Sequence, residues 1–127
     1  MNPQNRIISI HVDAPDSIEG QTDRWVDVHA TIVREHIAVH PTFKRELRLR
    51  SEQWTATHVP TGRSLCRAAS ESLAVAAAAA FARLPVDWGV TTEATAKQWP
   101  AELLNHAHAI RCMAAVGDLQ ALKESSR

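Results

Sequence analysis

The sequence holds few of the residues from which catalytic and ligand-binding motifs are commonly built. Its 127 residues include two cysteines, four glycines, two phenylalanines and no tyrosine, and the formal net charge is zero. Two cysteines do not provide the disulfide framework of a small secreted domain. Four glycines leave little material for a glycine-rich phosphate loop, and no such motif occurs. A neutral chain also disfavours a general nucleic-acid coat protein or an acidic DNA mimic.

Long apolar runs are missing as well. No window approaches the roughly 20 apolar residues that span a bilayer, and the longest run, residues 73–82, is mostly alanine. The first fifteen residues hold a short apolar patch that His11 and Asp13 interrupt, which is unlike a signal peptide. We therefore expect a reduced, cytoplasmic protein of one domain, residues 1–127, with no membrane partner.

The first half of the chain carries the alternation that is typical of β-strands. Residues 24–35 alternate between apolar and polar side chains, as in a half-buried antiparallel strand. Residues 6–12 are rich in β-branched side chains and predict an earlier strand, and residues 36–41 predict a short later one. Residues 42–53 are either a basic edge strand or a loop. The apolar face of the strand at 24–35 holds Val26, Val28, Ala30 and Ile32.

Residues 54–68 predict a β-hairpin. The Pro-Thr-Gly sequence at 60–62 supplies its turn, because Pro60 has a fixed φ and Gly62 a permissive one. On the second arm, alternation places Arg63, Leu65 and Arg67 on the face opposite Cys66. The pattern therefore predicts a buried cysteine and arginines that point outward.

The second half of the chain predicts helices. Ser70 is a suitable N-cap for a helix that ends before Pro85. Pro100 suits the first turn of a later helix, Gly117 its C-terminal cap, and Asp118 the N-cap of a last short helix. The apolar stripe of the first helix is Leu73, Ala76, Ala77, Ala80, Phe81 and Leu84, and the face of the later one is Leu103, Leu104, Ala107, Ile110, Arg111 and Ala114.

Strands followed by helices predict an α+β fold. We expect an antiparallel sheet of about four to six strands within residues 6–68. Helices within residues 70–124 should pack on one face of that sheet, followed by a short polar tail. Trp88, which follows the first helix, is expected to fold back over the sheet or the helix end.

Cys66 and His58 raise the hypothesis of a cysteine enzyme. A nucleophilic cysteine needs a lowered pKa and a base within reach. A phosphatase-type loop places its arginine after the cysteine, whereas Arg63 precedes Cys66. A buried strand cysteine is therefore the favoured interpretation, and we assign no catalytic residue.

Seven histidines suggest a metal site, but their spacing does not support one. The best pair is His108 and Cys112, which are four residues apart and share a face of the predicted helix. Two ligands do not make a site, and no CxxC or HExxH motif accompanies them. We predict no metal and no cofactor.

The charges are unevenly distributed along the chain. Residues 41–70 hold six basic and two acidic side chains, a net charge of +4, whereas residues 1–40 carry −3 and residues 71–127 carry −1. This basic band can bind phosphates or an acidic protein surface, or it can be a solvated face paired with Glu46 and Glu52. It consists of Lys44, Arg45, Arg48, Arg50, Arg63 and Arg67.

Four tryptophans stand out in a chain without tyrosine. Tryptophans of this kind are most often core or rim residues, but an exposed one marks a protein–protein contact. We take Trp25 and Trp54 as the candidate contact aromatics.

The segments WTATHVPTGR, the alanine-rich helix and LPVDW, within residues 54–88, resemble small uncharacterised proteins of phages, plasmids and integrated elements. In size and style the chain is similar, by class, to anti-CRISPR proteins. This resemblance implies an inhibitor that contacts a protein partner, a CRISPR-Cas complex or nuclease, and it carries over no catalytic residue. The alternatives are a nucleic-acid-binding accessory protein that uses the basic band and, third, the Cys66–His58 enzyme.

Overall fold

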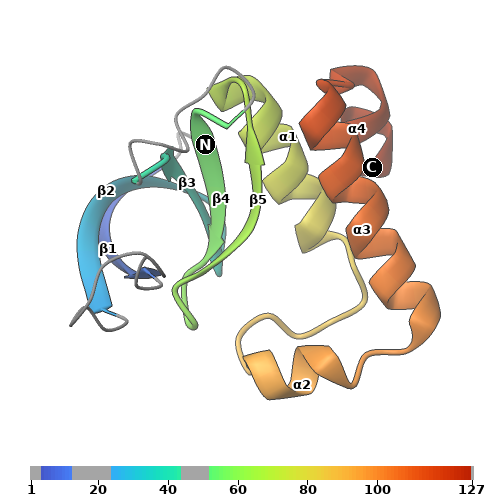
Figure 1. Cartoon of the computed structure of the whole chain (residues 1–127), viewed down its shortest axis with the longest axis horizontal. Helices are drawn as coiled ribbons and strands as arrows, with labels where there is room; N and C mark the ends of the chain where they lie inside the picture. Colours follow the sequence, from blue (N-terminus) through green and yellow to red (C-terminus); the bar gives the residue numbers. More distant parts are fainter. Residues whose placement is uncertain (1–3, 13–23, 44–51, 127) are drawn as a thin grey trace, which may run out of the picture.

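Five strands and four helices follow one another in the computed structural model, which describes residues 4–12, 24–43 and 52–126 (Figure 1). The predicted α+β fold is confirmed, because an antiparallel sheet in the first half of the chain is packed by helices from the second half. The strands are β1 (Gln4–Val12), β2 (Arg24–Arg34), β3 (Ile37–Pro41), β4 (Trp54–His58) and β5 (Arg63–Ala68). The helices are α1 (Glu71–Ala82), α2 (Glu93–Lys97), α3 (Ala101–Val116) and α4 (Leu119–Ser125).

The sheet is a meander in which each strand pairs with the next along the chain. The predicted hairpin is present, with β4 and β5 joined by a turn in which Gly62 has φ 69°. A bulge at Leu65 shifts the register of this hairpin. Cys66 is buried as predicted. The bulge brings Leu65 to the main core and puts Arg63 on the same face as Cys66, so the predicted placement of Arg63 and Leu65 on the opposite face is wrong.

The main core lies between the sheet and the helices. Helix α1 begins at its predicted cap, where the Ser70 hydroxyl accepts a hydrogen bond from the Leu73 amide at 3.2 Å. Its alanines are almost fully buried, because their small side chains let the helix lie close to β3, β4 and β5. Helix α3 packs against α1 and β5. On α3, Leu104 is 43% exposed, so its predicted place on the buried face is wrong.

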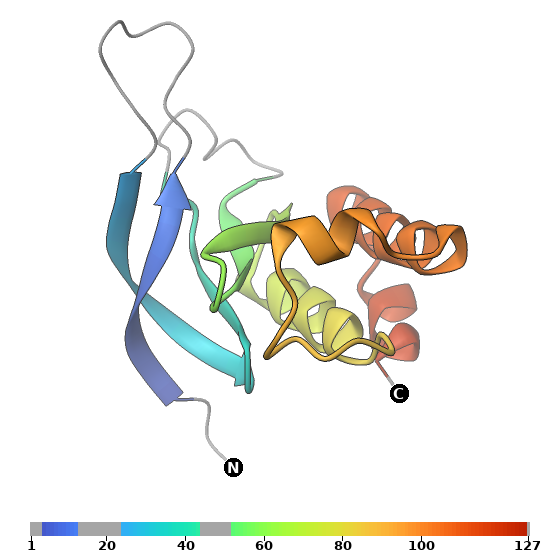
Figure 2. The ribbon, with the colours of Figure 1, turned by 90° about the horizontal axis from the view of Figure 1, so that it is seen from below.

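A second, smaller core lies on the other face of the sheet, and the sequence did not predict it. Ile8, Ile10, Ala30 and Ala38 form it. The apolar face of β2 contributes to it as predicted. In Figure 2, β1 lies farthest from the helices, whereas β2 runs from that side in toward β3 and also contacts α1. Strand β3 is therefore buried on both faces, which explains why four consecutive residues of it are buried.

The C-terminal end of β1 lies against the turn between β4 and β5. The amide of His11 donates a hydrogen bond to the carbonyl of Gly62 at 2.8 Å. The indole of Trp25, paired with His11 across β1 and β2, lies over the same glycine. The sheet is thus curled so that the first hairpin reaches the last one. None of the helices in the described part of the chain is long and apolar enough to cross a lipid bilayer.

Two buried histidines make the fold sensitive to acid. In the neutral ring of His40, Nδ1–H donates to the Pro41 carbonyl at 2.8 Å and Nε2 accepts from the Thr57 hydroxyl at 2.7 Å. Burial lowers its pKa below the usual 6.5, and burial lowers the pKa of His58 in the same way. The unfolded chain therefore takes up protons more readily, so stability is complete above about pH 6.5 and falls as the pH drops below it.

We accordingly expect the melting temperature to fall between about pH 7.5 and about pH 5. The variant His40→Gln should be less stable at neutral pH but show a smaller fall. The control His29→Gln changes an exposed histidine and should keep the wild-type slope. Thermal denaturation followed by circular dichroism measures all three. A His40→Gln protein with an undiminished fall would contradict the role of this residue.

Candidate functional site

The described part of the basic band lies on β5. Arg63 and Arg67 are both partly exposed there, and the structure does not describe residues 44–51, where Lys44, Arg45, Arg48 and Arg50 stand. Arg111 of α3 joins them, since its Nε donates a hydrogen bond to the carbonyl of Leu65 at 2.8 Å. Arg63, Arg67 and Arg111 form what we call the β5 arginine row.

A cavity of about 280 Å³ opens between the β4–β5 hairpin and the helices, and we call it the β5–α3 cleft. Its polar lining includes Arg63 and Arg111 of the arginine row and Ser64. Arg67 and Arg111 line a neighbouring hollow of about 380 Å³ together with Glu52. Arg111 therefore stands between the two hollows. The apolar wall of the cleft is formed by Leu65, Phe81, Trp88 and Trp99.

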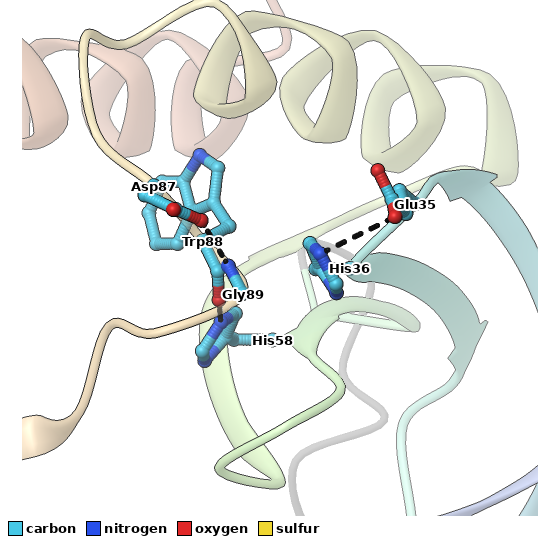
Figure 3. A network of polar contacts seen from close by, with 6 residues as sticks. All are labelled: Glu35, His36, His58, Asp87, Trp88 and Gly89. Atoms are coloured by element: carbon cyan, nitrogen blue, oxygen red, sulfur yellow. Dashed lines mark hydrogen bonds and ion pairs between the residues drawn. The ribbon is translucent and has the colours of Figure 1, made fainter.

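Trp88 is fixed in this wall from two sides, and Figure 3 shows its contact with His58. Its indole Nε1 donates to the carbonyl of Phe81 at 3.1 Å, and its own carbonyl accepts from His58 Nε2 at 2.6 Å. The Asp87 carboxylate accepts from the amide of Gly89 at 2.9 Å, which closes the turn around it. The prediction that Trp88 folds back over the helix end is confirmed.

His58 lies at the base of the cleft in a fixed orientation. Its Nε2–H donates to the Trp88 carbonyl, so Nδ1 is the nitrogen that accepts from the hydroxyl of Thr61 at 2.8 Å. Burial lowers the pKa of His58, which favours this neutral form, and the nearby His36 lowers it further. Because both ring nitrogens are engaged, His58 positions the Trp88 segment.

Cys66 lies in the main core, 8% exposed. Burial raises the pKa of its thiol to about 12, against the opposite effects of Arg111 and Arg67. The thiolate needed for nucleophilic attack is therefore scarce at neutral pH. Both cysteines are free thiols, and Cys112 is exposed on α3.

We expect iodoacetamide to label Cys112 readily and Cys66 slowly in the native protein at neutral pH, because the reagent needs an accessible thiolate. The variant Cys112→Ser isolates the reaction of Cys66, and mass spectrometry measures its rate. Unfolding in urea should restore rapid labelling. Fast labelling of Cys66 in the folded variant would revive the cysteine-enzyme hypothesis.

The predicted pairing of His108 with Cys112 is present on the surface of α3. The sulfur lies 3.5 Å from His108 Nε2. Among the residues that the structure describes, no three His, Cys, Asp or Glu side chains gather in a way that could hold a metal ion. This pair alone gives two ligands.

The two candidate contact aromatics differ in exposure. Trp25 is 57% exposed on β2, and its ring meets the His11 ring edge to face at 5.3 Å. Trp54 is half-buried and packs against the main core, so its interpretation as a contact residue is not supported. Trp25 remains the exposed aromatic of the pair.

Comparison with known proteins adds no information on the function of these residues. No protein-family model, no curated protein and no solved structure matches the chain. The functional inference therefore depends on the geometry of the arginine row, the cleft and Trp25.

Arg111 is a site residue that the sequence patterns did not predict, although its position on α3 carries a signal. Arg111 falls within the face of α3 that holds Ala107, Ile110 and Ala114. A charged residue beside such a stripe has to reach solvent or a polar partner, and Arg111 is exposed with its Nε bonded to the Leu65 carbonyl. The aromatic wall of the cleft could not be predicted from the sequence, because Phe81, Trp88 and Trp99 come from separate segments.

Proposed function

We propose that this chain is a non-enzymatic binding protein that acts by contact with a protein partner. The observation that carries the proposal is the exposure of Trp25, because a large aromatic side chain left 57% exposed is the residue type that dominates binding energy at protein interfaces. It lies on paired strands, which hold it in place before any partner binds.

The surroundings of Trp25 support a contact face. Ile7 is 63% exposed and lies opposite His29 on β1 and β2, and His11 lies opposite Trp25. Residues two apart on a strand share a face, so Ile7 and His11 stand on the same side of the hairpin as Trp25. We call Ile7, His11, Trp25 and His29 the contact face.

The charge beside this face indicates the character of the partner. Trp25 lies over Gly62, and the next residue along the chain is Arg63, the first member of the β5 arginine row. An aromatic anchor next to cationic side chains suits a partner whose surface is acidic around an apolar pocket. The mechanism we propose is occlusion of the surface to which the chain docks.

We infer the class of partner from the resemblance of residues 54–88 to small proteins of mobile elements. By that resemblance, we propose that the chain inhibits a host defence assembly, a CRISPR-Cas complex or nuclease. A steric inhibitor needs no catalytic group, which is consistent with a buried Cys66 and a His58 engaged at both nitrogens. The basic band leaves nucleic-acid binding as the competing function.

A binding panel tests the proposal. The purified chain is titrated against purified CRISPR-Cas complexes and nucleases of several types, and separately against single- and double-stranded nucleic acid. We expect binding to one complex at moderate salt. Trp25→Ala should weaken it by about 30-fold or more, as for an interface hot spot. Val116→Ala, which removes an apolar group exposed elsewhere on α3, should leave it unchanged.

Two results would overturn the proposal. Nucleic-acid affinity that falls steeply with salt, and that Arg48→Ala with Arg50→Ala weakens for all sequences alike, would assign the chain to nucleic acid. Partner binding that Trp25→Ala leaves intact would show that the contact face is placed elsewhere.

A further inference from the structure

The β5–α3 cleft has the features of a binding site separate from the contact face. Its aromatic wall is rigid, because Trp88 is bonded at both its indole and its carbonyl. Trp88 meets Trp99 edge to face at 5.7 Å and Phe81 at 6.4 Å. Edge-to-face contacts of this kind favour one relative orientation of the rings. A flat apolar group entering the cleft would meet a preformed surface.

Arg111 is held at the mouth of this cleft with its charge available. Its Nε donates to the Leu65 carbonyl at 2.8 Å, and its guanidinium carbon lies 5.8 Å from the centre of the Phe81 ring. These two contacts hold the guanidinium beside the Phe81 ring. Within the described part of the chain, its terminal nitrogens have no hydrogen-bond partner. They offer the paired donors that bind a carboxylate through two parallel hydrogen bonds.

The rest of the lining favours an anion. None of the described residues that line the cleft is acidic, and Arg63 lines it together with Arg111. The Ser64 hydroxyl adds a possible donor to this lining, whereas the Thr91 hydroxyl already donates to the carbonyl of Asp87 at 2.7 Å. Such a site attracts negative charge and can hydrogen-bond it.

The volume and the apolar walls of the cleft limit the kind of ligand that it can bind. A cavity of about 280 Å³ stands at the small end of ligand pockets, which hold roughly 300–1,000 Å³. Aromatic walls next to a guanidinium match a molecule with an apolar ring and one anionic group. We propose that the β5–α3 cleft binds a small carboxylate with an aromatic body, with Arg111 holding the carboxylate.

The test is a titration of the full chain followed by proton–nitrogen NMR. The probes are phenylacetate and indole-3-acetate, with neutral phenylacetamide as the matched control. We expect both carboxylates to shift the indole N–H signals of Trp88 and Trp99 and to bind at least about tenfold more tightly than the amide. Arg111→Met should weaken carboxylate binding at least about tenfold. Arg83→Met, which removes an exposed arginine outside the lining, should not.

A second variant guards against a general loss of structure in Arg111→Met. Ala96 lines the cleft, and Ala96→Phe would fill the cleft while keeping Arg111 in the sequence. It should abolish the shifts while the melting temperature stays near that of the wild type. Absence of shifts with both carboxylates, equal binding of the amide, or equal loss in Arg83→Met would overturn the proposal. Tighter binding of adenosine 5′-monophosphate than of either carboxylate would also overturn it.

This inference does not depend on the proposed protein partner. Trp25, which tests the contact face, does not line the cleft. Trp25→Ala should therefore leave the titration unchanged, and a negative binding panel would leave the cleft proposal standing.

Discussion

Replacing Phe81 by alanine is expected to lower the free energy of unfolding by about 3–5 kcal/mol. Phe81 is fully buried where α1 meets the sheet, and its carbonyl holds the Trp88 indole. Removing the ring leaves a cavity beneath Trp88 and takes away the surface on which Arg111 stacks. Since a domain of this size has about 5–15 kcal/mol of total stability, this loss is a large fraction of the total. Urea denaturation measures the change.

The variant Phe81→Leu separates packing from stacking. Leucine fills most of the same space, so it should cost much less stability than alanine. It still removes the ring beneath Arg111, so carboxylate binding in the cleft should weaken in both variants. A loss below about 1 kcal/mol for Phe81→Ala would contradict the position of this ring in the main core.

Gly62→Ala is expected to lower the free energy of unfolding by about 2–4 kcal/mol, for two reasons that add. Gly62 has φ 69°, a conformation that residues with a Cβ rarely adopt. An added Cβ would also lie 2.3 Å from the indole of Trp25 and 2.8 Å from the backbone nitrogen of His11. Because the second contact is to backbone, the first hairpin must move away from the turn. Thermal and urea denaturation measure the loss.

Gly117 offers a matched control for this effect. It has φ 77° at the C-cap of α3, but an added Cβ would approach another atom no closer than 3.8 Å. Gly117→Ala should therefore cost only the conformational strain, about 1 kcal/mol. Equal losses for the two variants would show that the curl of the sheet onto Gly62 contributes nothing to stability.

Local patterns in the sequence predicted most of the elements. Alternation located β2 and the hairpin, and cap residues located the ends of α1 and α3. The second core was not predicted, because alternation of apolar and polar residues identifies strands with one face in a core and the other in solvent. Residues 37–39 of β3 are Ile, Ala and Val, and this continuous apolar run is the signal of a strand buried on both faces.

Bulges account for the side chains that alternation does not place correctly in the strands. Period-2 alternation assumes a regular ladder, whereas the structure has irregularities beside Val33 and Leu65. Each extra residue turns an apolar side chain toward the helices, and both pack against the main core. Nothing in the local sequence marks these positions, because the partner strand sets the register.

The candidate site was predictable only in parts. The sequence indicated that an exposed tryptophan would mark a contact, and Trp25 is exposed. It could not bring Arg111 to the carbonyl of Leu65, because these residues are 46 positions apart. Long-range placement of this kind follows from how α3 packs along β5.

The most direct test of the central claim is a phage-plating assay in bacteria that carry an active CRISPR-Cas system targeting the phage. The systems tested should include the type whose complex the chain binds in the panel. Expression of the wild-type chain should restore plating, and Trp25→Ala, made at the same level, should not. Val116→Ala should act like the wild type. Unrestored plating in every system, or equal protection by Trp25→Ala, would contradict the account.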